Sequence, residues 1–152
     1  LTLEINKPAP NFAGWSLDNN KLVRLKDYIT DKKDTSLVIS FFASWCSICK
    51  HGLKLLKANK AILDKNNIQI LLIGVSDETA KIQAYLTEND ISFPVINDTY
   101  GAITAKYGVS GKEGNIKPEL PKTVVIGKDG NVKALFKSEG DDMIKLILEK
   151  VK

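Results

Sequence analysis

Short apolar runs alternate with amphipathic stretches along most of this 152-residue chain. Segment 37–42 (LVISFF) is rich in β-branched and aromatic residues, and segment 68–75 is a second apolar run, so both are predicted to be buried strands. Between them, apolar positions recur at helical spacing from about 46 to 65. A strand, a helix and a strand in this order predict a parallel pair with a helical crossover.

The rest of the chain alternates in the same way, with prolines disfavouring helix near its start and turn residues separating the elements. Two further strands flank the turn Lys128-Asp129-Gly130, a hairpin signal. The other predicted elements are an extended segment at 8–12, a strand at 21–25, a helix capped by Ser76-Asp77-Glu78, a strand at 93–96, a helix at 100–106, strands at 123–126 and 132–136, and a final amphipathic helix at 141–152. Trp15, Phe41 and Phe42 are expected in the core. The pattern predicts a mixed α/β fold.

The length and composition indicate the number of domains and the general class of the protein. With 43% hydrophobic and 26% charged residues, the chain is typical of one globular domain spanning 1–152. No apolar run approaches the roughly 20 residues that span a bilayer. The first ten residues lack the basic start and apolar stretch of a signal peptide. A cytosolic protein and an exported one whose leader precedes Leu1 therefore both stay open.

The net charge of +4 comes from 22 basic and 18 acidic residues that are well interspersed. Arg24 is the single arginine, whereas nucleic-acid binders usually cluster their charge and use arginine forks on phosphate and guanine. We therefore expect no nucleic-acid partner and interpret the charge as a solvated surface.

The only two cysteines, Cys46 and Cys49, lie three positions apart. A disulfide closing so short a loop stabilises a fold by only about 1.9 kcal/mol in the loop-entropy model, against about 3 kcal/mol for 15 residues. A zinc site needs four ligands, and His51 is the only other soft ligand nearby. The pair therefore favours redox chemistry, with no metal and no cofactor expected.

The position of the pair also indicates reactivity. Cys46 is predicted where a buried strand ends and a helix begins, so unpaired N–H groups and the positive end of the helix dipole would favour a thiolate there. Because the thiolate is the attacking species, Cys46 is the expected nucleophile. Cys49, one helical turn on, is expected to be more buried and to resolve a mixed disulfide.

Several motifs together resemble a known family. Segment 42–50 (FASWCSICK) resembles the active site of thioredoxin-fold proteins. The opening 9–12 (APNF), the helix and strand at 78–96, the triplet 107–109 (YGV) and the entry 120–123 (LPKT) are similar to the TlpA/ResA/CcmG-like thiol–disulfide oxidoreductases. The resemblance covers nearly the whole chain.

This resemblance implies a thioredoxin-like fold, a central mixed sheet flanked by helices with an N-terminal hairpin extension at about 1–30 and a helix–strand insertion at about 76–98. Pro121 matches the cis-proline that packs beside the disulfide, and Leu120 would offer backbone groups to an extended substrate. Trp45 would lie against the sulfurs. The alternatives are a trans proline opening an edge strand and a plain core tryptophan.

Departures from the family pattern matter as well. Ser40 stands where thioredoxin has a buried acid, and Gly52 stands where ResA-type proteins have a glutamate. Without a nearby base, Cys49 is expected to lose its proton less readily, which would slow the resolving step. His51 is either an electrostatic helper of the pair or an exposed surface residue.

Segment 110–119 lacks periodicity and is predicted to be a surface loop that precedes Pro121. It either shapes the choice of partner or is a decoration. Lys122 takes the place of a small hydroxyl residue common in the family.

The leading hypothesis is a thiol–disulfide oxidoreductase that acts on cysteine-containing proteins through a mixed disulfide at Cys46. The resemblance implies a periplasmic or otherwise extracytoplasmic reductant, for example in cytochrome c maturation, with an upstream thiol–disulfide electron donor and a membrane tether outside this sequence. The alternatives are a dithiol oxidant of the same fold, a peroxiredoxin-type peroxidase and a redox-dormant binding module. The peroxidase has little support, because Ala43 replaces the required threonine and Arg24 lies far away in sequence.

Overall fold

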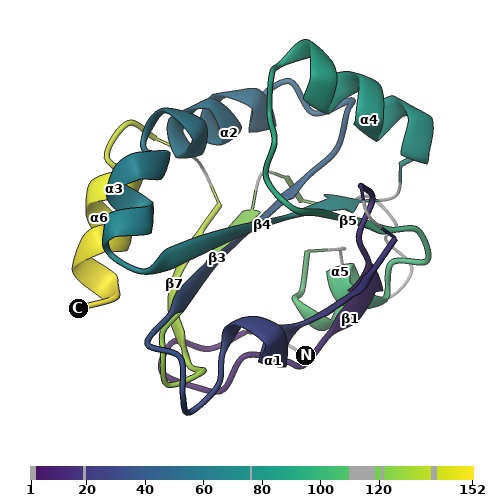
Figure 1. The fold of residues 1–152 in the computed structure, drawn as a ribbon. Helices are drawn as coiled ribbons and strands as arrows, with labels where there is room; N and C mark the ends of the chain where they lie inside the picture. Colours follow the sequence, from purple (N-terminus) through teal and green to yellow (C-terminus); the bar gives the residue numbers. More distant parts are fainter. Residues whose placement is uncertain (1–2, 19, 76, 110–118, 121, 138–139) are drawn as a thin grey trace.

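The protein is built on a five-stranded mixed sheet with the strand order β5-β4-β3-β6-β7 (Figure 1). The computed structural model describes residues 3–18, 20–75, 77–109, 119–120, 122–137 and 140–152. β3 is central: it pairs in parallel with β4 and antiparallel with β6. β5 extends the parallel half, and β7 completes the antiparallel half. The strands are β3 (Ser36–Phe42), β4 (Ile68–Val75), β5 (Val95–Asp98), β6 (Lys122–Ile126) and β7 (Val132–Phe136).

Helices and a hairpin cover the two faces of the sheet (Figure 1). One face carries α2 (Cys49–Ala58), α3 (Lys60–Lys65), α4 (Thr79–Glu88) and α6 (Met143–Lys150). The other face carries α1 (Leu25–Tyr28), α5 (Ala102–Lys106) and the hairpin of β1 (Ala13–Trp15) and β2 (Leu22–Arg24). The bridge between Ser16 and Ile96 joins this hairpin to β5. None of the helices in the described ranges combines the length and apolar character that crossing a bilayer requires.

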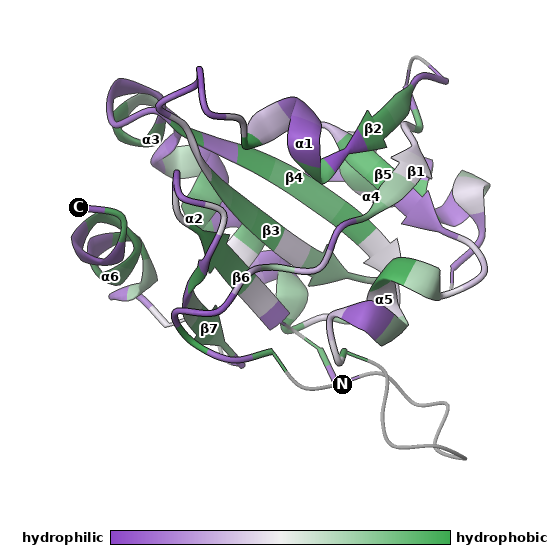
Figure 2. Cartoon of the chain, turned by 90° about the horizontal axis from the view of Figure 1, so that it is seen from below, coloured by the Kyte–Doolittle hydropathy of each residue, from purple (hydrophilic) through white to green (hydrophobic). Residues whose placement is uncertain are grey.

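The core divides into two clusters because successive side chains of a strand point to opposite faces. Every residue of β3 is buried, and Figure 2 shows β3 and β4 as mostly hydrophobic. Val38 and Phe42 join a cluster with both cysteines, which we call the disulfide-side core. Ile39 and Phe41 join a second cluster around Tyr107, which we call the Tyr107-side core. The predicted mixed α/β fold is therefore confirmed.

The predicted helix at 46–65 is wrong in two respects. It begins at Cys49 rather than Cys46, and it is interrupted at Asn59, which separates α2 from α3. The Asn59 amide donates a hydrogen bond to the Leu55 carbonyl at 2.8 Å, so a side chain competes for the backbone where the helix breaks. The buried positions of the two helices are Cys49, Gly52, Leu53, Leu56 and Leu63, whereas the apolar residues Ile48 and Ile62 are exposed.

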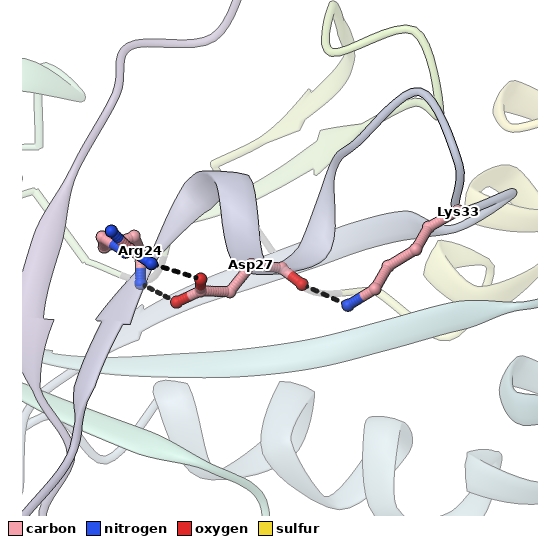
Figure 3. Close-up of polar contacts among 3 residues, drawn as sticks. All are labelled: Arg24, Asp27 and Lys33. Atoms are coloured by element: carbon pink, nitrogen blue, oxygen red, sulfur yellow. Dashed lines mark hydrogen bonds and ion pairs between the residues drawn. The ribbon is translucent and has the colours of Figure 1, made fainter.

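The strand predicted at 21–25 ends one residue early, because Leu25 begins α1. The Asp27 carboxylate caps this helix by accepting hydrogen bonds from the Arg24 backbone N–H at 2.8 Å and from its guanidinium at 3.2 Å. Lys33 donates to the Asp27 carbonyl at 2.6 Å (Figure 3). Burial acts to raise the Asp27 pKa, but the hydrogen bonds and charge of Arg24 outweigh it, so the pKa is lowered overall.

The expected core position of Trp15 is also wrong, because this residue is 61% exposed. Neighbouring residues of a strand face opposite ways, and Gly14 is the β1 residue that faces inward. A Cβ at Gly14 would lie 2.6 Å from Ile96 Cγ2, so this close approach needs a glycine. Trp15 therefore points outward, opposite Leu22 of β2.

The strand predicted at 93–96 begins instead at Val95 and continues to Asp98. Pro94 has no N–H to give to a sheet and contributes only its carbonyl, which accepts from the Leu72 N–H at 2.9 Å.

Candidate active site

Cys46 and Cys49 form a disulfide at the carboxyl end of the central strand. Cys49 is the first residue of α2, and the two Cα atoms are 5.5 Å apart. Cys46 lies before the helix because its N–H donates to the Ala43 carbonyl at 3.0 Å and closes a turn. A second turn, from the Lys50 N–H to the Ser47 carbonyl, comes before the regular helix. The turn after β3 therefore carries one sulfur and the helix carries the other.

The two cysteines differ in exposure in the predicted direction. Cys49 is fully buried at 0%, whereas Cys46 retains 7%. The residues beside them are open to solvent, with Trp45 54% and Ile48 66% exposed. Trp45 is therefore not a core residue, and a partner that reaches Cys46 would meet two large apolar side chains. Such exposed apolar groups are typical of a protein interaction surface.

The first turn of α2 carries no negative charge of its own. The residues of α2 are all described, and its first turn contains no acidic residue. Lys50 and His51 stand there instead, and Ile48 provides no side-chain cap for the free N–H groups. The positive end of the helix dipole is therefore unopposed by its own first turn.

Ser40 occupies the β3 position where thioredoxin has an acid. It is buried, and its Oγ has no hydrogen-bond partner among the described residues. As a member of the alternating set that includes Val38 and Phe42, it lies on the face of the disulfide-side core. At this position of β3 the buried polar group is thus a hydroxyl rather than a carboxylate.

His51 makes an ion pair with Asp141, with Nε2 and Oδ1 3.0 Å apart. Its side chain is 54% exposed and that of Asp141 is 91% exposed. This geometry fits the exposed-surface interpretation of His51 and ties the first turn of α2 to the residues before α6.

Leu120 is half-buried and packs against both cores. Pro121, for which the resemblance implies a cis-proline, lies outside the described residues. So does segment 110–118 of the predicted loop, which is expected either to shape the choice of partner or to be a decoration. The Glu119 N–H donates to the Val109 carbonyl at 2.9 Å. Lys122, which follows Pro121, donates to the Tyr107 and Gly108 carbonyls at 3.1 and 3.3 Å. Burial lowers the pKa of Lys122, the charge of Lys137 adds to this, and Glu119 opposes it.

Asp77 is a site residue that the sequence reading missed. It was interpreted as part of a cap for the following helix, but the residue at that cap is Glu78. Instead, Asp77 Oδ2 accepts a hydrogen bond from the Ser44 backbone N–H at 2.7 Å. The sequence could have indicated Asp77, because it follows the predicted strand at 68–75. The carboxyl ends of neighbouring parallel strands meet at one edge of a sheet, and functional sites often form there.

Comparison with known proteins supports this reading of the geometry. The sequence model of the AhpC/TSA family matches residues 5–135. The chain belongs to the AhpC/TSA family. It is 27% identical to the thiol-disulfide oxidoreductase ResA of Bacillus thuringiensis over 137 residues, which cover 90% of this chain and 72% of that protein.

Solved structures show the same fold. The thioredoxin domain of a thiol-disulfide oxidoreductase from Bacteroides vulgatus superposes with a TM-score of 0.78 at 19% identity, covering 99% of each chain. The peroxidoxin BcpB of Mycobacterium tuberculosis reaches 0.79 at 19% identity, covering 98% of this chain and 96% of that one. The thioredoxin-like fold and the relationship to TlpA/ResA/CcmG-like proteins are confirmed. The chain is a thiol–disulfide oxidoreductase.

Proposed function

We propose that this chain reduces disulfides in cysteine-containing proteins outside the cytoplasm, with Cys46 as the attacking sulfur. The observation that carries the proposal is the asymmetry of the pair. Cys46 keeps some exposure at a turn between two exposed apolar residues, whereas Cys49 is enclosed at the start of α2. The Cys46 sulfur is thus accessible to a partner protein, whereas the Cys49 sulfur can react only with Cys46.

The exchange proceeds in two steps from the dithiol form. The Cys46 thiolate attacks one sulfur of the substrate disulfide, forms a mixed disulfide and releases the other substrate sulfur as a thiolate. The Cys49 thiolate then attacks Cys46, forms the Cys46–Cys49 disulfide and releases the second substrate thiolate. Two electrons pass to the substrate, and the two protons given up by the cysteines end on the substrate thiols.

Trp45, Leu120 and Pro121 are the proposed substrate contacts. Exposed Trp45 would provide apolar area beside Cys46, and Leu120 would offer backbone groups to an extended segment of the partner. Pro121 is proposed, from the resemblance, as the cis-proline that packs beside the sulfurs, since proline adopts the cis form at low cost.

The proposed compartment and partners rest on the family resemblance. An extracytoplasmic reductant needs an upstream thiol–disulfide electron donor, because each turnover leaves the pair oxidised. The name of the ResA relative supports disulfide exchange. The family resemblance supports a role in keeping the haem-binding cysteines of apocytochrome c reduced. A membrane tether outside this sequence would keep such a protein near its donor.

The peroxidase alternative has weaker support, although a peroxidoxin shares the fold. Arg24 is engaged by Asp27 on the hairpin that covers the opposite face of the sheet from Cys46, so it does not polarise a peroxide there. A peroxide-consumption assay separates the two activities.

The test of the proposal is the reduction potential of the Cys46–Cys49 couple, titrated against a dithiol buffer and read by alkylation and mass. A value near that of thioredoxin, about −270 mV, is expected of a reductant. A value near −120 mV would instead indicate a disulfide donor. A couple that does not titrate would indicate a dormant binding module.

A further inference from the structure

Asp77 connects the loop after β4 to the turn that carries Cys46. Its Oδ2 accepts from the Ser44 N–H at 2.7 Å, and its Oδ1 accepts from the Glu78 N–H at 2.9 Å. Ser44 lies two residues before Cys46, whose own N–H is bonded back to the Ala43 carbonyl. The turn is therefore held from within by one backbone hydrogen bond and from outside by the carboxylate of a residue 33 positions away.

Asp77 is itself held in place from β5. The side-chain amide of Asn97 donates to the Asp77 carbonyl at 3.3 Å and to the Thr79 hydroxyl at 3.0 Å. Asn97 is paired with Gly74 of β4, and Gly74 is paired with Phe42 of β3. The carboxyl ends of three parallel strands are thus linked by polar contacts that end at the Cys46 turn.

We propose that Asp77 is a positioning residue for thiol–disulfide exchange. By accepting the Ser44 N–H, it fixes the backbone on which the Cys46 sulfur is presented to a partner. A hydrogen bond to an ionised carboxylate is roughly twice as strong as a neutral one, so this contact can hold the turn in place. Because a reacting atom must be held close to its attack geometry, a looser turn costs reaction rate more than fold stability. The inference rests on the proposed function.

Asp77→Ala and Asp77→Asn separate the hydrogen bond from the charge. Alanine removes the acceptor, whereas the asparagine carbonyl oxygen can still accept the Ser44 N–H. Asn also removes a negative charge near the Cys46 turn, which by itself would favour the Cys46 thiolate. Asp64→Asn is the matched control, because Asp64 lies on α3 in an exposed pair with Lys60.

The experiment measures the rate at which the dithiol form of each variant reacts with oxidised glutathione, well below the unfolding temperature of that variant. We expect Asp77→Ala to react at least tenfold more slowly, Asp77→Asn to stay within about threefold of the wild type, and Asp64→Asn to be unchanged. Asn97→Ala, which acts through Asp77, is expected to react two- to fivefold more slowly and carries the test if Asp77→Ala fails to fold.

Three results would overturn the proposal. Asp77→Ala and Asn97→Ala could both react at the wild-type rate, or Asp77→Asn could be as slow as Asp77→Ala. The rate loss could also vanish once the folded fraction is taken into account. A wild-type dithiol that does not react at all contradicts the proposed function itself and removes the basis of this inference.

Discussion

The two faces of the central sheet are built from the same strands but handle their polar groups differently. On one face, Tyr107 is fully buried between Phe12 and Phe41, with ring centroids 6.1 and 5.8 Å away. Its hydroxyl donates to the Pro10 carbonyl at 2.6 Å. On the other face, Ser40 Oγ is buried with no partner among the described residues. The Tyr107 hydroxyl therefore has a hydrogen-bond partner in the Tyr107-side core, whereas the Ser40 hydroxyl has none in the disulfide-side core.

This difference indicates that one face of the sheet serves mainly the stability of the fold and that the other also serves the reactivity of the disulfide. A buried hydroxyl with a partner contributes to folding, and a buried hydroxyl without one costs free energy. The Tyr107-side core also fastens the N-terminal segment, since Pro10 precedes β1. The disulfide-side core instead borders an edge with an exposed tryptophan and a reactive sulfur pair. We expect large truncations on the first face to change stability alone, and large truncations that loosen the packing around the disulfide on the second face to change reactivity as well.

Truncation in each core gives the largest expected effect. Tyr107→Ala should lower the free energy of unfolding by about 3–5 kcal/mol, as large aromatic truncations do. Leu53→Ala, in α2 one turn after Cys49, should lower it by about 2–5 kcal/mol. Denaturant unfolding measures both losses. The rate of reaction with oxidised glutathione per folded molecule should fall only for Leu53→Ala. Equal rates for the two variants would show that the two faces do not differ in this way.

Removing only the Tyr107 hydroxyl should cost about 1 kcal/mol at neutral pH, the value of one hydrogen bond. Burial raises the pKa of Tyr107 above its usual 10.0. Its contribution is therefore complete below pH 10 and is lost as pH rises above 10, because the unfolded chain ionises first. Tyr107→Phe should lack this alkaline loss. Unfolding measured from pH 7 to 11 checks the prediction, and identical slopes in both proteins would refute it.

A smaller effect is expected at Ser40. Ser40→Ala removes an unpartnered buried hydroxyl, so the free energy of unfolding of the oxidised protein should rise by about 1 kcal/mol or less. The exchange rate should not change. A marked slowing of the resolving step, seen as accumulation of a mixed disulfide, would instead assign the hydroxyl a part in proton transfer to or from Cys49.

The smallest effect is expected at His51. Its pair with Asp141 is exposed on both sides, and such pairs contribute little. His51→Ala should change the free energy of unfolding by no more than about 0.5 kcal/mol and leave the exchange rate near the wild-type value. A tenfold slower exchange would restore the interpretation of His51 as an electrostatic helper.

Local patterns predicted much of this molecule. The apolar run at 68–75 coincides with β4, and the predicted strands at 123–126 and 132–136 correspond to β6 and β7. The cysteine spacing and the strand before it located the redox pair. These features depend on residues that are neighbours in sequence, so periodicity and turn chemistry reveal them.

Contacts between distant residues were not predicted, for a physical reason. The role of Asp77 depends on Ser44, which lies 33 positions away in another loop. Trp15 is exposed because Gly14 must approach Ile96. Each of these depends on which strands become neighbours, and no pattern within one segment encodes that.

The most direct test of the central claim is to trap the mixed disulfide. Cys46→Ser and Cys49→Ser are each reduced and mixed with oxidised glutathione, and adducts are followed by mass spectrometry. The account predicts that Cys49→Ser rapidly forms a stable glutathione adduct on Cys46, whereas Cys46→Ser, left with the enclosed Cys49, reacts at least tenfold more slowly. Equal reactivity of the two variants, or faster reaction through Cys49, would contradict it.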